Sequence, residues 1–235
     1  MKKILLALLV LCLVAAGLVI AFVPNWAGDG SDAIGEAAVG DTINFGGYTW
    51  QVLDVQGNRA LLITEHIIAM RPFYPRTGEI TWAQSDIRAW LNDSFLNSFS
   101  ARERSRIVQT TVRNDANPVF GTTGGDDTQD YVFLLSIEEV ERYFDDCDDA
   151  RSAVIPSIAV WEQWVVDFGR DRGVRHAFML GFDTFPMPQS WGLRSPGGHS
   201  THAAYIVDNG EINRYGHGIG LGFGGIRPVI WVDLG

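Results

Sequence analysis

The 235-residue sequence is poor in cysteine and almost without lysine. Its two cysteines are Cys12 and Cys147, and Cys12 lies in a long apolar run, so a framework of internal disulfides is excluded. The two lysines are Lys2 and Lys3, and the formal net charge is −10. A chain this acidic cannot build the dense basic surface that nucleic acids require, so we expect no nucleic-acid partner.

Charged side chains are absent from residues 4–23, a run of 20 apolar residues. That length spans a bilayer core of about 30 Å as a helix, so residues 1–23 are predicted to be a transmembrane anchor. A signal peptide cleaved after Val19-Ile20-Ala21, and a buried helix of a soluble protein, are the alternatives. Lys2 and Lys3 precede the run and acidic residues follow it, which favours a cytoplasmic N-terminus and an extracytoplasmic domain. If the run is cleaved, the domain is secreted.

Common catalytic motifs are also missing from the sequence. It contains no Gly-x-Ser-x-Gly elbow, Walker loop, His-Glu-x-x-His or dinucleotide fingerprint. Gly220-x-Gly222-x-x-Gly225 matches a phosphate-loop pattern formally, but no helix is predicted after it. Hydrophobic residues make up 46% of the chain, which excludes global disorder. We expect a flexible spacer over residues 24–38 and one folded domain over residues 39–235.

Alternating apolar residues and turn signals predict a domain that mixes strands and helices. Strands are expected at 41–45, 48–55 and 59–66, at 203–207 and 211–215 around an Asp208-Asn209-Gly210 turn, and at 228–234. Capping-box patterns at Thr81-x-x-Gln84, Ser100-x-x-Glu103 and Ser136-x-x-Glu139 predict three helix starts. An apolar stripe predicts a further helix at 157–169.

Two groups of side chains could hold a metal ion. The polar, glycine-rich segment 114–130 offers Asn117, Asp126, Asp127 and Asp130 as oxygen ligands for Ca²⁺, although a solvated loop with Asx turns explains it equally simply. His199, His202 and His217 are three of the five histidines and fall within 19 residues, so they could surround one Zn²⁺ with Asp208 or Glu211 behind them. The alternative is three exposed loop histidines without a ligand.

Several segments together resemble a large bacterial family of uncharacterised domains whose usual pattern is WLRSPG, a hairpin and GVRPA. The segments are Trp191–Gly197, Ala203–Tyr205, Asp208–Gly210 and Gly225–Trp231, with Gly40–Trp50, Thr81–Trp82, Arg88–Asn92 and Asp130–Ser136 upstream. Gly192 departs from the usual pattern. That family is similar to the C-type-lectin-like folds, which include the sulfatase-modifying, formylglycine-generating enzymes. The resemblance implies an α+β domain with small twisted antiparallel sheets, flanking helices and long irregular loops.

The resemblance also bears on function. The formylglycine-generating enzymes use a pair of cysteines in the C-terminal region, and this chain has none after Cys147, so their chemistry cannot be carried over. Related ligand-binding proteins use exposed residues of the C-terminal strands and loops. The corresponding candidate ligand-binding face is His199, Thr201, His202, Tyr205, Asn213, Arg214, Tyr215 and His217. Trp191, Arg194 and Arg227 are expected to be structural. Asp126 and Asp127 could be partners of the arginines, but the sequence does not decide this; the alternative role of the arginines is to clamp an anionic ligand.

These observations favour a membrane-anchored extracytoplasmic domain that binds a glycan, an envelope polymer or a protein and catalyses nothing. Two other functions are kept open. One is a metal-dependent enzyme resembling the sulfatase modifiers, and the other is a structural accessory domain of an envelope complex.

Overall fold

The computed structural model describes residues 35, 37–76, 78–144, 148–156, 187–220 and 224–235. The chain divides into two units, residues 1–30 and 31–235, and every described residue belongs to the second. The predicted membrane segment, most of the predicted spacer and the predicted helix at 157–169 therefore lie outside the described residues. Within the described residues, no helix has the length and apolar character needed to cross a bilayer.

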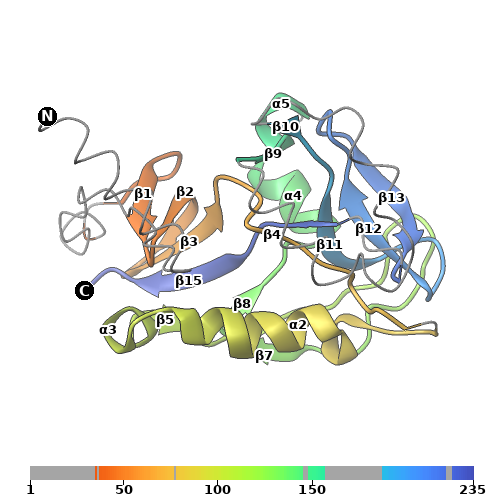
Figure 1. The fold of residues 1–235 in the computed structure, drawn as a ribbon, viewed down its shortest axis with the longest axis horizontal. Coiled ribbons are helices and arrows are strands. Elements are labelled where there is room, and N and C mark those ends of the chain that lie inside the picture. Colours follow the sequence, from red (N-terminus) through yellow and green to blue (C-terminus); the bar gives the residue numbers. More distant parts are fainter. Residues whose placement is uncertain (1–34, 36, 77, 145–147, 157–186, 221–223) are drawn as a thin grey trace, which may run out of the picture. The chain divides into compact units, whose positions relative to one another are not determined.

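The fold is α+β, and strands outnumber helices among the described residues (Figure 1). The strands are β1 (Thr42–Phe45), β2 (Tyr48–Gln56), β3 (Arg59–Thr64), β4 (Ala69–Met70), β5 (Ile107–Val108), β6 (Thr110–Val112), β7 (Thr128–Asp130), β8 (Val132–Phe133), β9 (Val154–Ile155), β10 (Met187–Pro188), β11 (Trp191–Pro196), β12 (His202–Ile206), β13 (Ile212–Gly218), β14 (Gly225–Ile226) and β15 (Val229–Asp233). The helical elements are η2 (Trp82–Gln84), α2 (Asp86–Trp90), η3 (Leu91–Phe95), η4 (Leu96–Ser98), α3 (Ala101–Arg104), α4 (Ile137–Tyr143) and α5 (Asp148–Arg151).

A six-stranded sheet contains both ends of the domain. The predicted meander forms β1, β2 and β3, and Gly57 supplies the positive φ of +59° in the β2–β3 turn. The predicted last strand is β15, which pairs antiparallel with β3, β5 and β8. Val229, Ile230 and Val232 of β15 are fully buried. The C-terminal strand therefore lies inside this sheet and next to the N-terminal meander.

A five-stranded sheet in the order β13-β12-β11-β14-β4 carries the C-terminal hairpin. Its β12 and β13 are the predicted hairpin strands, and Gly210 adopts a φ of +91° in the turn between them. Two further two-stranded sheets join β9 to β10 and β6 to β7. The larger sheets and the helices share one hydrophobic core, in which Trp50, Trp82 and Trp191 are buried.

A nearly continuous helical stretch, from η2 through α2 to α3, runs along both larger sheets (Figure 1). It contacts β11 of one sheet at η2 and β8 of the other at η3. The predicted capping box at Thr81 was wrong, because the Thr81 side chain makes no capping hydrogen bond. Ser85 caps α2 instead and accepts from the Arg88 N–H. The capping boxes predicted at Ser100 and Ser136 are both present.

Candidate functional site

Three aromatic rings from the β12–β13 hairpin and the turn before it meet a fourth, Phe120, from the loop between β6 and β7. His199 Nε2 lies 3.0 Å from the Tyr215 hydroxyl, and the His199 and His202 ring centres are 5.5 Å apart. Tyr215 also contacts the ring of His202, at 5.6 Å, and the ring of Phe120, at 5.6 Å. Tyr215 is 49% exposed and Phe120 47% exposed. We call Phe120, His199, His202 and Tyr215 the ring cluster.

Asn117 fixes the loop that brings Phe120 to the hairpin. Its side chain is 1% exposed, and Nδ2 donates to the carbonyls of Pro196 and Arg214 at 2.8 Å each. Its Oδ1 accepts from the N–H groups of Val119 and Phe120. An amide that satisfies four groups in this way holds the loop in one conformation. Phe120 is therefore presented on a fixed loop, and this residue was missed by the sequence analysis, although an apolar Val-Phe pair in a polar loop is a usable signal.

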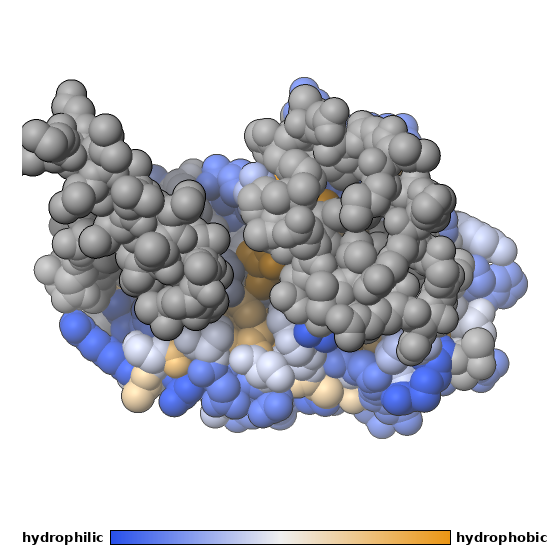
Figure 2. All heavy atoms as spheres, in the orientation of Figure 1, coloured by the Kyte–Doolittle hydropathy of each residue, from blue (hydrophilic) through white to orange (hydrophobic). Residues whose placement is uncertain are grey.

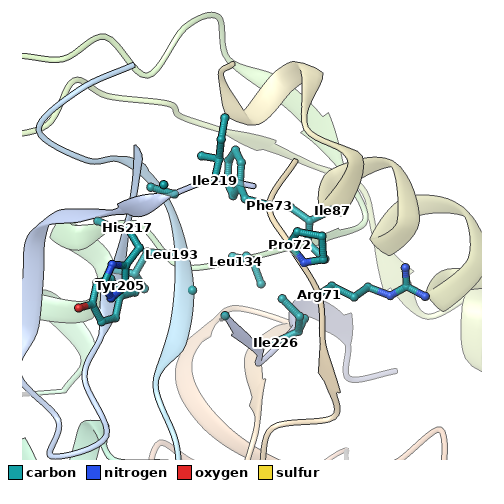
Figure 3. A pocket seen from close by; sticks show the side chains of 15 residues that line it. Arg71, Pro72, Phe73, Ile87, Leu134, Leu193, Tyr205, His217, Ile219 and Ile226 are labelled. Atoms are coloured by element: carbon teal, nitrogen blue, oxygen red, sulfur yellow. The ribbon is translucent and has the colours of Figure 1, made fainter. Parts of the chain in front are cut away.

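A second pair of rings lies at the rim of a small cavity. Tyr205 and His217 stack with centres 4.4 Å apart and planes at 14°. Figure 3 shows this pair on one side of the cavity and Arg71 and Pro72 on the other. The cavity offers about 60 Å³ to a water-sized molecule and has a mostly apolar lining that includes Phe73. That volume suits two waters and is too small for a sugar ring.

Burial and neighbouring charges favour the neutral forms of His202 and Tyr205. Burial lowers the pKa of His202, and the nearby His199 and His217 lower it further because a second positive charge would be repelled. Burial raises the pKa of Tyr205, whose hydroxyl accepts from Asn213 Nδ2 at 3.1 Å. At neutral pH, His202 and Tyr205 therefore offer uncharged hydrogen-bonding groups.

The eight residues predicted as a ligand-binding face lie on the hairpin and its preceding turn, and they differ in exposure. His199, Thr201, Tyr215 and His217 are exposed, and the other four are partly buried. Asn213 is occupied inside the hairpin, where Oδ1 accepts from the Gly216 N–H at 2.9 Å. Arg214 forms an ion pair with Glu141. The groups available to a ligand are chiefly those of the ring cluster and Thr201.

The structure does not assemble the predicted metal ligands. Among the described residues, no group of three or more His, Cys, Asp or Glu side chains is placed to hold a metal ion. His217 stacks on Tyr205 rather than joining His199 and His202 around one point. In the 114–130 segment, Asp127 Oδ1 accepts from the Asn114 N–H, and Asp126 contributes its carbonyl to Asn114 Nδ2.

Asp130 and Asn117 are also engaged in other contacts. The fully buried Asp130 pairs with Arg88 at 2.6 Å and accepts from Trp82 Nε1 and the Thr128 hydroxyl. The Asn117 amide holds the Phe120 loop, as described above. Asp130 and Asn117 therefore use their side-chain oxygens within the fold, and among the described residues the acidic side chains of this segment do not gather around one point.

The three residues expected to be structural are all buried. Trp191 Nε1 donates to the Arg151 carbonyl at 2.9 Å. Arg194 binds both carboxylate oxygens of Glu139, with Nη2 to Oε1 at 2.8 Å, and also donates to backbone carbonyls. The carboxylate that pairs with Arg194 is Glu139 of α4, and not Asp126 or Asp127. Arg227 donates from Nε to the Thr64 carbonyl at 3.0 Å.

Comparison with known proteins assigns the chain to a family and indicates no function for the site. No curated protein and no solved structure matched the chain. A family model matched residues 57–234, which include the Phe120 loop, the β12–β13 hairpin and β15. The chain therefore belongs to the family described as Domain of unknown function (DUF6273).

Proposed function

We propose that this chain is a membrane-anchored, extracytoplasmic recognition domain that binds a neutral polysaccharide through the ring cluster and catalyses no reaction. The observation that carries the proposal is the exposure of Tyr215 and Phe120 beside the imidazoles of His199 and His202. The proposal includes residues 4–23 as the anchor and a C-type-lectin-like arrangement of the described sheets.

The chemistry of the ring cluster suits a sugar. Aromatic faces pack against the C–H faces of a pyranose ring, while hydroxyl and imidazole groups exchange hydrogen bonds with its hydroxyls. Tyr215 and His199 provide both functions, and the Thr201 hydroxyl lies 3.1 Å from His202 Nδ1 at the edge of the cluster. Mixed apolar and hydrogen-bonding character within one small surface distinguishes this cluster from a purely apolar patch.

The shape of the surface supports a polymer rather than a small enclosed ligand. The cavity beside Tyr205 is too small for a sugar ring, whereas the ring cluster is exposed on the hairpin. A chain of sugars can cross such a surface and contact more than one ring. Only Val119, Phe120 and Tyr215 are large exposed apolar residues in this part of the described structure, which is little for a stable protein interface of about 800 Å² per partner.

Charge supports a neutral polymer. The chain carries a formal net charge of −10, so a polyanion would approach against repulsion. The nearest cation on the hairpin, Arg214, is paired with Glu141. The lowered pKa of His202 keeps that imidazole uncharged at neutral pH. Neutral hydroxyl-rich ligands avoid these costs.

The proposal is tested by binding of the full-length chain, purified in detergent, to glucan, mannan and chitin, with the polyanion alginate alongside. We expect binding to at least one neutral polymer and none to alginate. Tyr215→Ala should weaken that binding about tenfold, since a lost aromatic contact of about 1.4 kcal/mol corresponds to that factor.

Tyr131→Ala provides the matched control, because Tyr131 is also exposed but lies between β7 and β8. The control variant should bind as the unmodified chain does. Absence of binding to every neutral polymer, or equal losses in the two variants, would refute the proposal.

A further inference from the structure

Arg227 is a buried cation without a carboxylate partner among the described residues. The residue is 2% exposed, and its one hydrogen bond runs from Nε to the Thr64 carbonyl at 3.0 Å. Its Nη1 is buried and has no hydrogen-bond partner among the described residues. The guanidinium carbon lies 4.9 Å from the Trp191 ring centre and 5.9 Å from that of Phe144. Aromatic faces stabilise the cation but accept none of the hydrogen bonds that its edge donates.

Arg194 shows how the same domain stabilises another buried arginine. It is 4% exposed, and Glu139 neutralises it through a two-oxygen contact while backbone carbonyls accept from its remaining donors. A buried charge without such a counter-charge is costly, because desolvation is not offset. Arg227 therefore lacks, within the described part of the chain, the compensation that Arg194 has.

Thr64, whose carbonyl accepts from Arg227 Nε, carries a second buried group without a partner among the described residues. It is 1% exposed, and its hydroxyl has no hydrogen-bond partner in the described part of the chain. Its backbone is fully used, since its N–H donates to the Pro228 carbonyl at 3.1 Å and its carbonyl accepts from Arg227. Two residues in direct contact thus each present one unsatisfied buried donor, Nη1 and Oγ1.

We propose that Arg227 Nη1 and Thr64 Oγ1 together bind a small monovalent anion of the chloride class. Both groups donate hydrogen bonds, and an anion accepts from both while neutralising the guanidinium. The rings of Trp191 and Phe144 lie against the guanidinium, so the anion lies at its edge rather than over its face. A water molecule could accept the same hydrogen bonds but would leave the guanidinium without a hydrogen-bonded counter-charge.

The charge state of Arg227 is consistent with this assignment. Burial lowers the pKa of Arg227 to about 10, and the nearby Glu65 carboxylate raises it. A group with that pKa is still protonated at neutral pH, so the demand for a negative charge persists under physiological conditions. The site is separate from the ring cluster, and the inference does not depend on the proposed function.

The test compares thermal unfolding of the full-length chain in sodium chloride and in sodium gluconate at equal ionic strength. Gluconate is too large for a site formed by two donors. We expect chloride to raise Tm by about 2–4 °C in a saturable manner, since a ligand that binds the folded state stabilises it. Crystals grown with bromide should show an anomalous peak within hydrogen-bonding distance of both Arg227 and Thr64.

Thr64→Val removes the hydroxyl and keeps the shape, so the chloride shift should fall by at least half. Thr128→Val is the matched control, because that buried hydroxyl donates to Asp130 instead. The control should have a lower Tm and an unchanged chloride shift. Equal Tm values in the two salts, a full shift in Thr64→Val, or a crystal in which water or a carboxylate occupies the position would overturn the assignment.

Discussion

Asp130 illustrates how burial decides the role of a charged residue. Its carboxylate is completely buried and is surrounded by Trp82 Nε1, the Thr128 hydroxyl and two nitrogens of Arg88. The Asp126-Asp127 pair a few residues earlier has the same chemistry but is exposed. Sequence alone shows all three as equivalent oxygen ligands. Only the paired strands β6 and β7, which carry Asp130 inward, separate them.

Asp130→Asn should lower the free energy of unfolding by about 2–4 kcal/mol, because Arg88 loses its counter-charge and an amide cannot accept all the hydrogen bonds. Asp127→Asn is the control, since Asp127 is exposed and accepts one hydrogen bond, from Asn114. Its cost should be below about 1 kcal/mol. Urea unfolding measures both values. Similar losses in the two variants would contradict the structural role of Asp130.

Helix starts show how far local patterns predict an element. The patterns at Ser100 and Ser136 formed the predicted capping boxes, whereas the pattern at Thr81 did not. At Thr81 the chain makes the short turn η2 before α2, and the buried Ser85 receives the Arg88 N–H. A capping box is local, but the choice between two neighbouring caps depends on the packing of Trp82 into the core.

Ser85→Ala should cost about 0.5–2 kcal/mol of stability, the usual range for a lost N-cap. The same hydroxyl also donates to the Trp82 carbonyl, which favours the upper part of that range. Thr81→Ala should cost less than about 0.5 kcal/mol, because its side chain caps nothing. Chemical denaturation of the two variants decides where the helix begins. A larger loss for Thr81→Ala would place the cap at the position that the sequence pattern indicated.

At the scale of the whole molecule, the pairing of distant segments is what sequence reasoning could not supply. The meander, the hairpin and the last strand were predicted from alternation and turn residues, and the α+β class was implied by the family resemblance. The partners of these segments were not predicted, because alternation identifies a strand without identifying its neighbour. The ring cluster likewise depends on contacts between segments that are distant in the sequence. Phe120 reaches Tyr215 because Asn117 binds backbone carbonyls 79 and 97 residues away in the chain.

The position of β15 makes the fold depend on its last residues. β15 joins the meander to β5 and β8, so its removal would separate segments that have no other pairing in the six-stranded sheet. Val229, Ile230 and Val232 are each fully buried, and each such side chain contributes about 1.5–3 kcal/mol. Together they approach the whole stability of a typical domain, about 5–15 kcal/mol.

Deleting residues 229–235 should therefore abolish cooperative thermal unfolding and near-ultraviolet circular dichroism. Deleting Gly235 alone, which is exposed and donates its N–H to the Asp233 side chain, should preserve both signals. If the seven-residue deletion still unfolds cooperatively, β15 lies outside the folding core, and the topology described above does not represent the stable domain.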